Sequence, residues 1–286
     1  MTAIKYIKEQ CSHIELKLFV PDFFLEVAKN LVPNMSINPF SKKYKFNKDL
    51  GTLKTDCLQH DTLGTHLVDN AFHVLVNKQV SIEHKNYVKL NTKKIKIDKF
   101  NLPSKYVVVC TGFTAPVREW IPSSINGTVD YIKSKGYKVV FLGNKVTPVI
   151  GCADDIIGKF NLEVDYSKGM SLIDKTTLLE AGAIIGASCG IIGNDNGLLH
   201  LAGCTEVPIV GGFTSVNPSV RMPYRHNILG WNFYPVVPEE SLECRFCQSD
   251  IPLYYNFNFT QCLYGDRLCT KQLTADKFIE QLEKFL

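Results

Sequence analysis

The sequence predicts an α/β protein with a doubly wound parallel sheet, and two observations support this prediction. The run "YVVVC" (106–110) is apolar at every position, which is typical of a strand buried on both faces of a parallel sheet. From about residue 104 onward, such runs alternate with segments in which apolar residues recur at helical spacing. Strands that alternate with helices favour a parallel sheet covered by helices on both sides.

The N-terminal third of the chain predicts a smaller unit with its own strand and helices. Residues 14–33 indicate a strand, a break at Pro21 and then a helix. A second helix is expected over residues 65–76, after a loose segment at 34–64 that is rich in Lys, Asn and Asp. The stretch "NTKKIKIDK" (91–99) alternates charged and apolar residues, which is typical of a solvated strand edge.

We place a domain boundary near residues 100–104, so that the predicted domains are 1–103 and 104–286. In the second domain, Ser171 followed by Asp174 resembles the capping box of a helix. The amphipathic C-terminal segment is expected to pack on the sheet rather than to contact a membrane. The predicted elements after the first strand are a helix at about 120–135, a strand at 137–143, a helix at 171–183, a strand at 190–195, a helix at 196–204, a strand at 207–213 and the segment 274–286.

The composition narrows the class of protein. A chain of 286 residues that is 45% hydrophobic can form one large core or two ordinary ones. The net charge of +4 and a pI near 8.4 suit phosphate-bearing small molecules but fall short of a dedicated nucleic-acid binder. No stretch reaches the roughly 18 apolar residues that a membrane span requires, and the N-terminus lacks an apolar signal core. We therefore expect a cytoplasmic protein whose ten cysteines are thiols or metal ligands.

Three loops are expected at the carboxyl ends of strands, where open α/β sheets bind their ligands. The first offers Thr111, Gly112 and Arg118, and the second offers small residues and Lys145. The three loops are "TGFTAPVREW" (111–120), "GNK" (143–145) and the turn inside "IIGNDNGLLHLAG" (191–203).

The third loop predicts a phosphate site at the start of a helix. A strand ends at Gly193, the chain turns through Asn194 and Asp195, and a helix begins around residue 196 or 197, so that free N–H groups and the positive end of the helix dipole face the crevice. Gly197 would let a ligand approach the backbone closely, and His200 lies one turn further on. The alternative is a capped helix with a histidine that belongs to the core.

Residues 176–218 resemble the C-terminal domain of glycosyltransferase family 9, the heptosyltransferase family of lipopolysaccharide synthesis. In that family a helix and a strand precede Asp-Ser/Thr-Gly-x-x-His, and a second helix, a Pro, a strand and a Phe-Gly turn follow. The two strand–loop units before this segment are also similar, so the resemblance covers about 104–286 well and 1–103 loosely. The residues that fall on the pattern in order are Asp195, Gly197, His200, Ala202, Pro208 and Phe213.

The resemblance implies a GT-B architecture of two Rossmann-like domains facing each other across a cleft. The C-terminal domain would hold a nucleotide-diphosphate sugar, and the N-terminal domain would present a glycan or lipid-linked glycan acceptor. It also implies inverting transfer of a sugar such as heptose without a metal, with Arg118, Lys145 and the helix after Asp195 stabilising the leaving diphosphate. The predicted donor-site residues are Thr111, Gly112, Arg118, Gly143, Asn144, Lys145, Ser171, Asp195, Asn196, Gly197, Leu198 and His200.

The chain departs from the family pattern at its start. Family members begin with a strand and a Gly-Asp loop that carries the usual candidate base, whereas this chain opens on "TAIKYIKEQ", which resembles the following helix. We therefore expect an N-terminal domain without its first strand and loop. The remaining candidates for a catalytic base are Asp61, His66 and Asp69, although a structural or solvent-exposed role is the commoner one for each. Two alternatives stay open: a nucleotide-sugar-binding protein without catalysis, and a sugar transferase acting on modified DNA bases.

Four cysteines near the C-terminus have spacings that a metal site could use. Their pattern is C-x2-C-x14-C-x6-C, and four thiols with a leading C-x2-C can bind a structural zinc. The alternative is a set of reduced or partly paired cysteines. The residues are Cys244, Cys247, Cys262 and Cys269.

Overall fold

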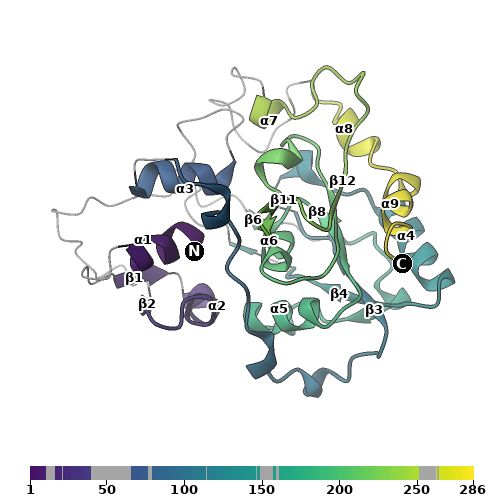
Figure 1. Cartoon of the computed structure of the whole chain (residues 1–286). Coiled ribbons are helices and arrows are strands. Elements are labelled where there is room, and N and C mark those ends of the chain that lie inside the picture. The colour runs from purple at the N-terminus through teal and green to yellow at the C-terminus, as the bar shows by residue number, and fades with distance from the viewer. Residues whose placement is uncertain are drawn as a thin grey trace.

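The structure is a computed structural model, shown as a cartoon in Figure 1. Asp61, one of the predicted base candidates, lies outside the residues that it describes. The described residues are 1–10, 17–20, 22–39, 66–76, 79–113, 115–145, 147–148, 157–158, 161–250, 262 and 264–286.

The centre of the molecule is a six-stranded sheet in which every neighbouring pair of strands is parallel. The strand order is β12-β9-β8-β3-β4-β7. Counted along the chain within this sheet, that order is the doubly wound arrangement of a dinucleotide-binding fold, whose ligand crevice lies where the winding reverses. The reversal is between β3 and β8, and the prediction of a doubly wound sheet is confirmed. The strands are β3 (Tyr106–Cys110), β4 (Lys138–Leu142), β7 (Met170–Ser171), β8 (Ile191–Asn194), β9 (Ile209–Gly212) and β12 (Phe233–Val236).

Helices cover both faces of the sheet, because alternate strand residues point to opposite sides (Figure 1). Val108 and Ile191 belong to the core under α5 (Leu178–Gly186) and α6 (Gly197–Gly203). The other face belongs to α4 (Pro122–Ser134) and α9 (Ala275–Leu282). On that face Trp120 stacks on Phe278 with ring centroids 4.2 Å apart. The C-terminal amphipathic segment therefore packs on the sheet, as predicted.

Two parallel strands near the N-terminus form a second, smaller sheet, and a helix lies between them in the chain. Tyr6 and Phe72 join α1 to α3, with ring centroids 5.3 Å apart. Val27 and Leu31 of α2 share the core under α5. The strand and helix expected within 14–33 and the helix expected at 65–76 are thus found in the described residues. The elements are α1 (Thr2–Gln10), β1 (Lys17–Val20), η1 (Asp22–Phe24), α2 (Leu25–Leu31), β2 (Ser36–Pro39) and α3 (Leu67–Val76).

Two predictions made from the sequence are wrong. The helix expected from residue 171 begins at Leu178, and its capping box is formed by Thr177 and Glu180. Ser171 instead lies in β7, where it pairs with Phe141 of β4. The segment 91–99, expected as a strand edge, forms two short 3-10 helices, η5 (Thr92–Lys94) and η6 (Asp98–Phe100).

Short elements complete the described part of the chain. None of the helices found there is long and apolar enough to span a bilayer. The remaining elements are η4 (Ile82–His84), η7 (Pro116–Arg118), β5 (Thr147–Pro148), β6 (Ile157–Gly158), η8 (Tyr166–Lys168), η9 (Pro218–Val220), β10 (Tyr224–Arg225), β11 (Ile228–Leu229), α7 (Cys247–Asp250) and α8 (Leu268–Lys271).

Candidate functional site

A cavity of about 940 Å³ lies at the carboxyl ends of β3, β4 and β8. Its opposite wall comes from α1, α2 and α3, so the cavity lies between the two parts of the chain. This is the position at which a doubly wound sheet binds its ligand. Of the predicted donor-site residues, those that line it are Gly112, Arg118, Gly143, Asn144, Asp195, Asn196, Gly197, Leu198 and His200.

Arg118 and Asp195 form an ion pair in this cavity. The Nη1 atom of Arg118 is 3.5 Å from Oδ2 of Asp195, and only 8% of the Asp195 side chain is exposed. Burial acts to raise the pKa of Asp195, but Arg118, then Arg221 and His200, together hold it below its ordinary value. Asp195 is therefore a carboxylate at neutral pH.

Backbone and amide contacts fix the two partners of this ion pair. The amide of Asp195 donates to the carbonyl of Gly212 at 2.9 Å, which ties the loop after β8 to β9. The side-chain amide of Asn194 donates to the carbonyl of Arg118 at 2.8 Å. Gln248 accepts a hydrogen bond from Nη2 of Arg118 at 3.2 Å. The carboxylate and the guanidinium group are thus held on neighbouring loops at the point where the winding reverses.

The side chain of Asn196 caps the start of α6. The Oδ1 atom of Asn196 accepts hydrogen bonds from the amides of Leu198 and Leu199, at 2.9 and 3.4 Å. These two N–H groups are therefore occupied, which leaves fewer for a phosphate than the sequence predicts. Gly197 remains open, because a Cβ built on it meets nothing within 4 Å.

His200 also lines the cavity, one turn into α6. Its Nδ1 atom is 3.4 Å from the hydroxyl of Tyr87. Burial lowers the pKa of His200 to about 4, and the carboxylate of Asp195 opposes that shift only in part. The imidazole is therefore neutral near pH 7, so that it can donate or accept a hydrogen bond without carrying charge.

Three predicted donor-site residues are not among those that line the cavity. Thr111 is buried, and its hydroxyl is 2.8 Å from the hydroxyl of Tyr166. The backbone amide of Lys145 donates to Asp174 at 2.9 Å, and the residue is exposed. Ser171 lies in β7, as described above. The donor-site role of these three residues stays a prediction.

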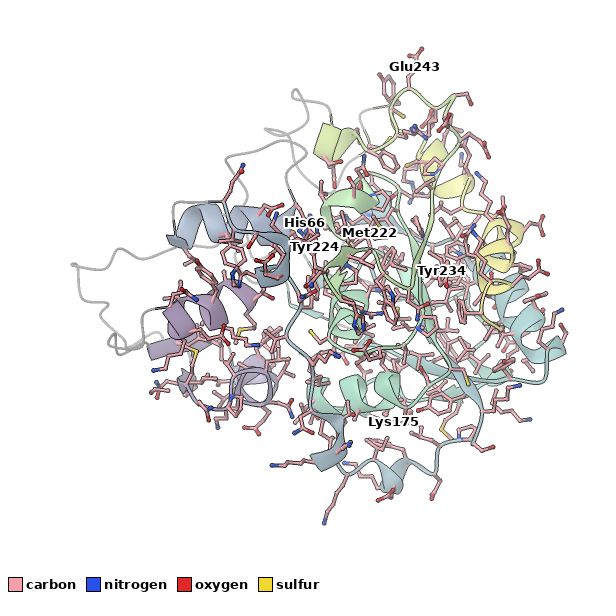
Figure 2. The ribbon with its side chains drawn as sticks, in the orientation of Figure 1. His66, Lys175, Met222, Tyr224, Tyr234 and Glu243 are labelled. Carbon is pink, nitrogen blue, oxygen red and sulfur yellow. The ribbon has the colours of Figure 1, made fainter. Side chains whose placement is uncertain are left out.

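The two described base candidates have other partners. Nδ1 of His66 accepts from the amide of Val68 at 3.1 Å, so its Nε2 donates to the carbonyl of Met222 at 2.8 Å (Figure 2). Both ring nitrogens therefore hold the start of α3 against the loop that carries Met222. Asp69 is 2.6 Å from Nζ of Lys85 and is not among the residues that line the cavity.

Sequence reasoning missed several residues of the cavity. Asp22 and Glu26 lie on the wall formed by η1 and α2. Arg221 reaches the cavity from the loop between β9 and β12. No motif marks these positions, and only the folded arrangement brings them to the site.

The four C-terminal cysteines are free thiols in the structure. Burial, and after it charge on the other three cysteines, raises the pKa of the Cys269 thiol to about 12. Among the described residues, however, no group of three or more His, Cys, Asp and Glu side chains is arranged to hold a metal ion. The zinc site therefore stays a prediction.

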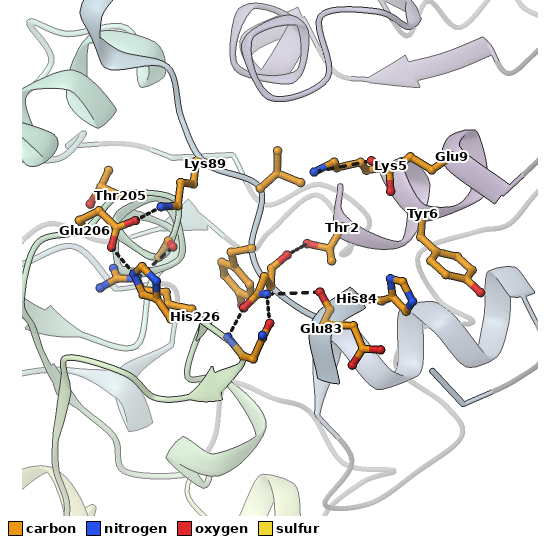
Figure 3. Close-up of a pocket in the computed structure, with 16 residues that line it drawn as sticks. Thr2, Lys5, Tyr6, Glu9, Glu83, His84, Lys89, Thr205, Glu206 and His226 are labelled. Carbon is orange, nitrogen blue, oxygen red and sulfur yellow. Dashed lines mark hydrogen bonds and ion pairs between the residues drawn. The ribbon is translucent and has the colours of Figure 1, made fainter. Parts of the chain in front are cut away.

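A second cavity of about 610 Å³ lies between α1 and the end of α6 (Figure 3). Charged side chains on its wall pair with one another. Glu206 lies 2.5 Å from Nζ of Lys89 and 2.7 Å from Nε2 of His226. Arg225 donates to the carbonyls that end α6, including that of Gly203 at 3.2 Å. In the first cavity, by contrast, single buried atoms of charged side chains have no hydrogen-bond partner among the described residues.

Comparison with known proteins identifies relatives by their sequence. Lipopolysaccharide heptosyltransferase 3 of Escherichia coli K12 is 23% identical over 172 residues, which are 58% of this chain and 49% of that protein. Lipopolysaccharide heptosyltransferase 2 of Salmonella typhimurium is 26% identical over 137 residues, which are 47% of this chain and 38% of that protein. The chain thus spans about half the length, or less, of these relatives.

Solved structures match the fold over nearly the whole chain. The dodecameric iron-containing heptosyltransferase TibC of enterotoxigenic E. coli, solved in complex with ADP-D-β-D-heptose, matches with a TM-score of 0.70 and 16% identity over 99% of this chain and 71% of that one. The E. coli ADP-heptose lipopolysaccharide heptosyltransferase II matches with a TM-score of 0.61 and 13% identity, over 99% of this chain and 93% of that one. These likenesses confirm the predicted GT-B type of fold.

A sequence profile decides the family. The profile of glycosyltransferase family 9 (heptosyltransferase) matches residues 42–246, which include the cavity loops after β3, β4 and β8. This chain belongs to glycosyltransferase family 9.

Proposed function

We propose that this chain binds a nucleotide-diphosphate sugar in the cavity at the carboxyl ends of β3 and β8 and takes part in moving the sugar to a glycan acceptor. A heptose donor and a lipopolysaccharide-type or lipid-linked acceptor are the first candidates, because the relatives are heptosyltransferases and TibC was solved with ADP-heptose. The observation that carries the proposal is the Arg118–Asp195 pair, buried at the crevice where the winding reverses.

In such a transfer, an acceptor hydroxyl attacks the anomeric carbon while the bond from that carbon to the diphosphate breaks. The hydroxyl proton passes to a base, and the nucleoside diphosphate leaves with the bonding electrons. Arg118 would stabilise that developing negative charge from a partly buried position, where electrostatic interactions are stronger than in water. We propose that the transfer inverts the anomeric centre and needs no metal, since a guanidinium group can take the charge.

The test is to incubate the chain with ADP-heptose and a panel of other nucleotide sugars, and to follow its melting temperature and the mass of added acceptors. Binding with product formation supports the proposal. Binding without product supports the second candidate, a nucleotide-sugar-binding protein without catalysis, which is favoured by the pairing of His66 and Asp69 with other groups. A chain whose melting temperature no nucleotide or nucleotide sugar shifts contradicts both.

Gly197→Ala tests whether the donor lies against the backbone at the start of α6. The added Cβ meets no protein atom within 4 Å, so we expect a melting temperature equal to or slightly above that of wild type. Donor affinity should fall by about tenfold, because a methyl group would occupy the space of a ligand that approaches this closely. Titration calorimetry with ADP measures the effect. Unchanged affinity would place the diphosphate elsewhere.

We also propose that the four C-terminal cysteines bind a single metal ion, as zinc or iron, through thiolates. Four thiols suit either metal, and TibC is an iron-containing relative. Metal analysis of gently purified protein is expected to give about one ion per chain, and Cys244→Ser with Cys247→Ser should abolish it. Cys189→Ser is the matched control. Protein purified without any bound zinc or iron would contradict this proposal.

We propose a cytoplasmic location for this reaction. The described cysteines are all free, which supports a reducing compartment. Location of a tagged chain by cell fractionation tests this.

A further inference from the structure

Arg221 brings a second guanidinium group to the cavity that holds Arg118 and Asp195. It directly follows η9, and its backbone amide donates to the carbonyl of Pro218 at 2.9 Å. This contact fixes the position of the Arg221 backbone. The residue therefore reaches the site from the connection after β9, independently of the loops after β3 and β8.

The charged groups in this cavity do not satisfy one another. The Nε atoms of Arg118 and Arg221 and the Oδ2 atom of Asp195 are buried, and the described part of the chain offers them no hydrogen-bond partner. At 3.5 Å, the approach of Arg118 to Asp195 is too long for a strong hydrogen bond. Buried polar atoms without partners are rare in folded proteins, and each calls for an explanation.

The three residues line the same cavity. Burial lowers the pKa of the Arg221 guanidinium, and Asp195 and Arg118 then shift it in opposite directions, as their charges require. Asp195 is the carboxylate that interacts with both guanidinium groups, so positive charge is in excess beside it, while Asp22 and Glu26 lie on the wall formed by η1 and α2. An anion is the ligand that removes this excess.

We propose that Arg118 and Arg221 form a clamp in which each guanidinium group binds one phosphate of a diphosphate, with Asp195 orienting both arginines. Guanidinium groups match phosphate oxygens in a planar, two-pronged geometry. Two such groups that face one carboxylate suit two linked phosphates better than one. This inference rests on the proposed function, since it names how the donor's diphosphate is held.

Calorimetric titration with ADP and AMP tests the clamp on wild type and on Arg221→Gln. Wild type should bind ADP more tightly than AMP. Arg221→Gln should weaken ADP binding by about tenfold or more and AMP binding by less than about threefold, because only ADP reaches both arginines. The ADP affinity of Arg221→Lys should lie between those of wild type and Arg221→Gln, since an ammonium group keeps the charge but lacks the two-pronged geometry of a guanidinium group.

Arg245→Gln is the matched control. Arg245 lies outside the cavity, 3.8 Å from exposed Glu240, and its loss should leave both affinities unchanged. Should Arg221→Gln not fold, the Arg221→Lys measurement decides alone. Equal ADP affinity in wild type and in the folded Arg221 variants overturns the clamp and leaves the proposed function standing. A wild-type chain that binds neither ADP nor AMP overturns both.

Discussion

Replacing Arg118 with glutamine is expected to lower kcat/KM for sugar transfer by about 100- to 1,000-fold, the range seen when one charge-stabilising donor is removed from an active site. Glutamine keeps much of the length of the side chain but loses the charge. The leaving diphosphate would then meet only Arg221, so the loss should appear in kcat as well as in KM. Steady-state kinetics with a saturating acceptor separate the two.

The same substitution should change the stability of the protein with pH. In wild type, the cations near Asp195 hold its pKa below the ordinary value. This carboxylate therefore adds stability above its unfolded pKa of about 4, and that stability is lost as pH falls through the folded pKa. Without Arg118, Arg221 is the guanidinium group that remains to oppose the effect of burial on the pKa of Asp195. Urea unfolding of Arg118→Gln should therefore show a smaller gain in stability between pH 3 and pH 7 than wild type.

Arg245→Gln is the matched control for both measurements. Arg245 lies 3.8 Å from exposed Glu240 and is not among the residues that line the cavity. Its removal should lower kcat/KM by less than about threefold, as expected for a charge outside the site. Equal losses in the two variants would indicate that only the general positive field matters and would refute the direct role of Arg118.

The sheet could be predicted from the sequence because its strands are buried on both faces. Such strands read as continuous apolar runs, and the helices between them leave a clear period. The start of α5 could not be predicted in the same way, since Ser171 with Asp174 and Thr177 with Glu180 both fit a capping box. The second pair is used because Ser171 pairs with Phe141 in the sheet, a long-range contact that no local pattern reports.

In the candidate site, too, residues on one short segment could be predicted from the sequence and residues far apart in the chain could not. Asp195, Gly197 and His200 lie on one short segment, so a motif could place them together. Arg221 follows η9 and Asp22 lies in η1, far apart in the chain, and only packing brings them to the same cavity. His66 is a base candidate for which the sequence favours a structural role, and its two nitrogens contact the backbone of residues 68 and 222.

The second large effect is expected from Gly193→Ala, in the middle of the strands that form the crevice. Gly193 pairs with Cys110 on one side and with Gly211 on the other. A Cβ at residue 193 would lie 2.7 Å from the carbonyl oxygen of Cys110 and would also overlap its Sγ atom. The backbone of β3 cannot yield to this methyl group without breaking the pairing of the two strands.

We expect Gly193→Ala to lower the free energy of unfolding by about 3 kcal/mol, the upper range for overpacking a core. Urea denaturation measures the loss. Adding Cys110→Ala should recover only part of it, because that change removes the Sγ overlap and leaves the contact with the carbonyl oxygen. Gly197→Ala, four positions further on, is the matched glycine control with open space around its Cβ.

Gly193→Ala should also weaken ADP binding in any protein that still folds. Asn194 and Asp195 follow directly in the chain, and Asn194 holds the carbonyl of Arg118. A shift of β8 away from β3 would therefore move Asp195 and Arg118 apart. The donor cavity would then no longer hold these two side chains together. If the variant is as stable as wild type and binds ADP equally well, then β3 and β8 do not approach as closely as this, and the crevice at the reversal of winding is not the donor site.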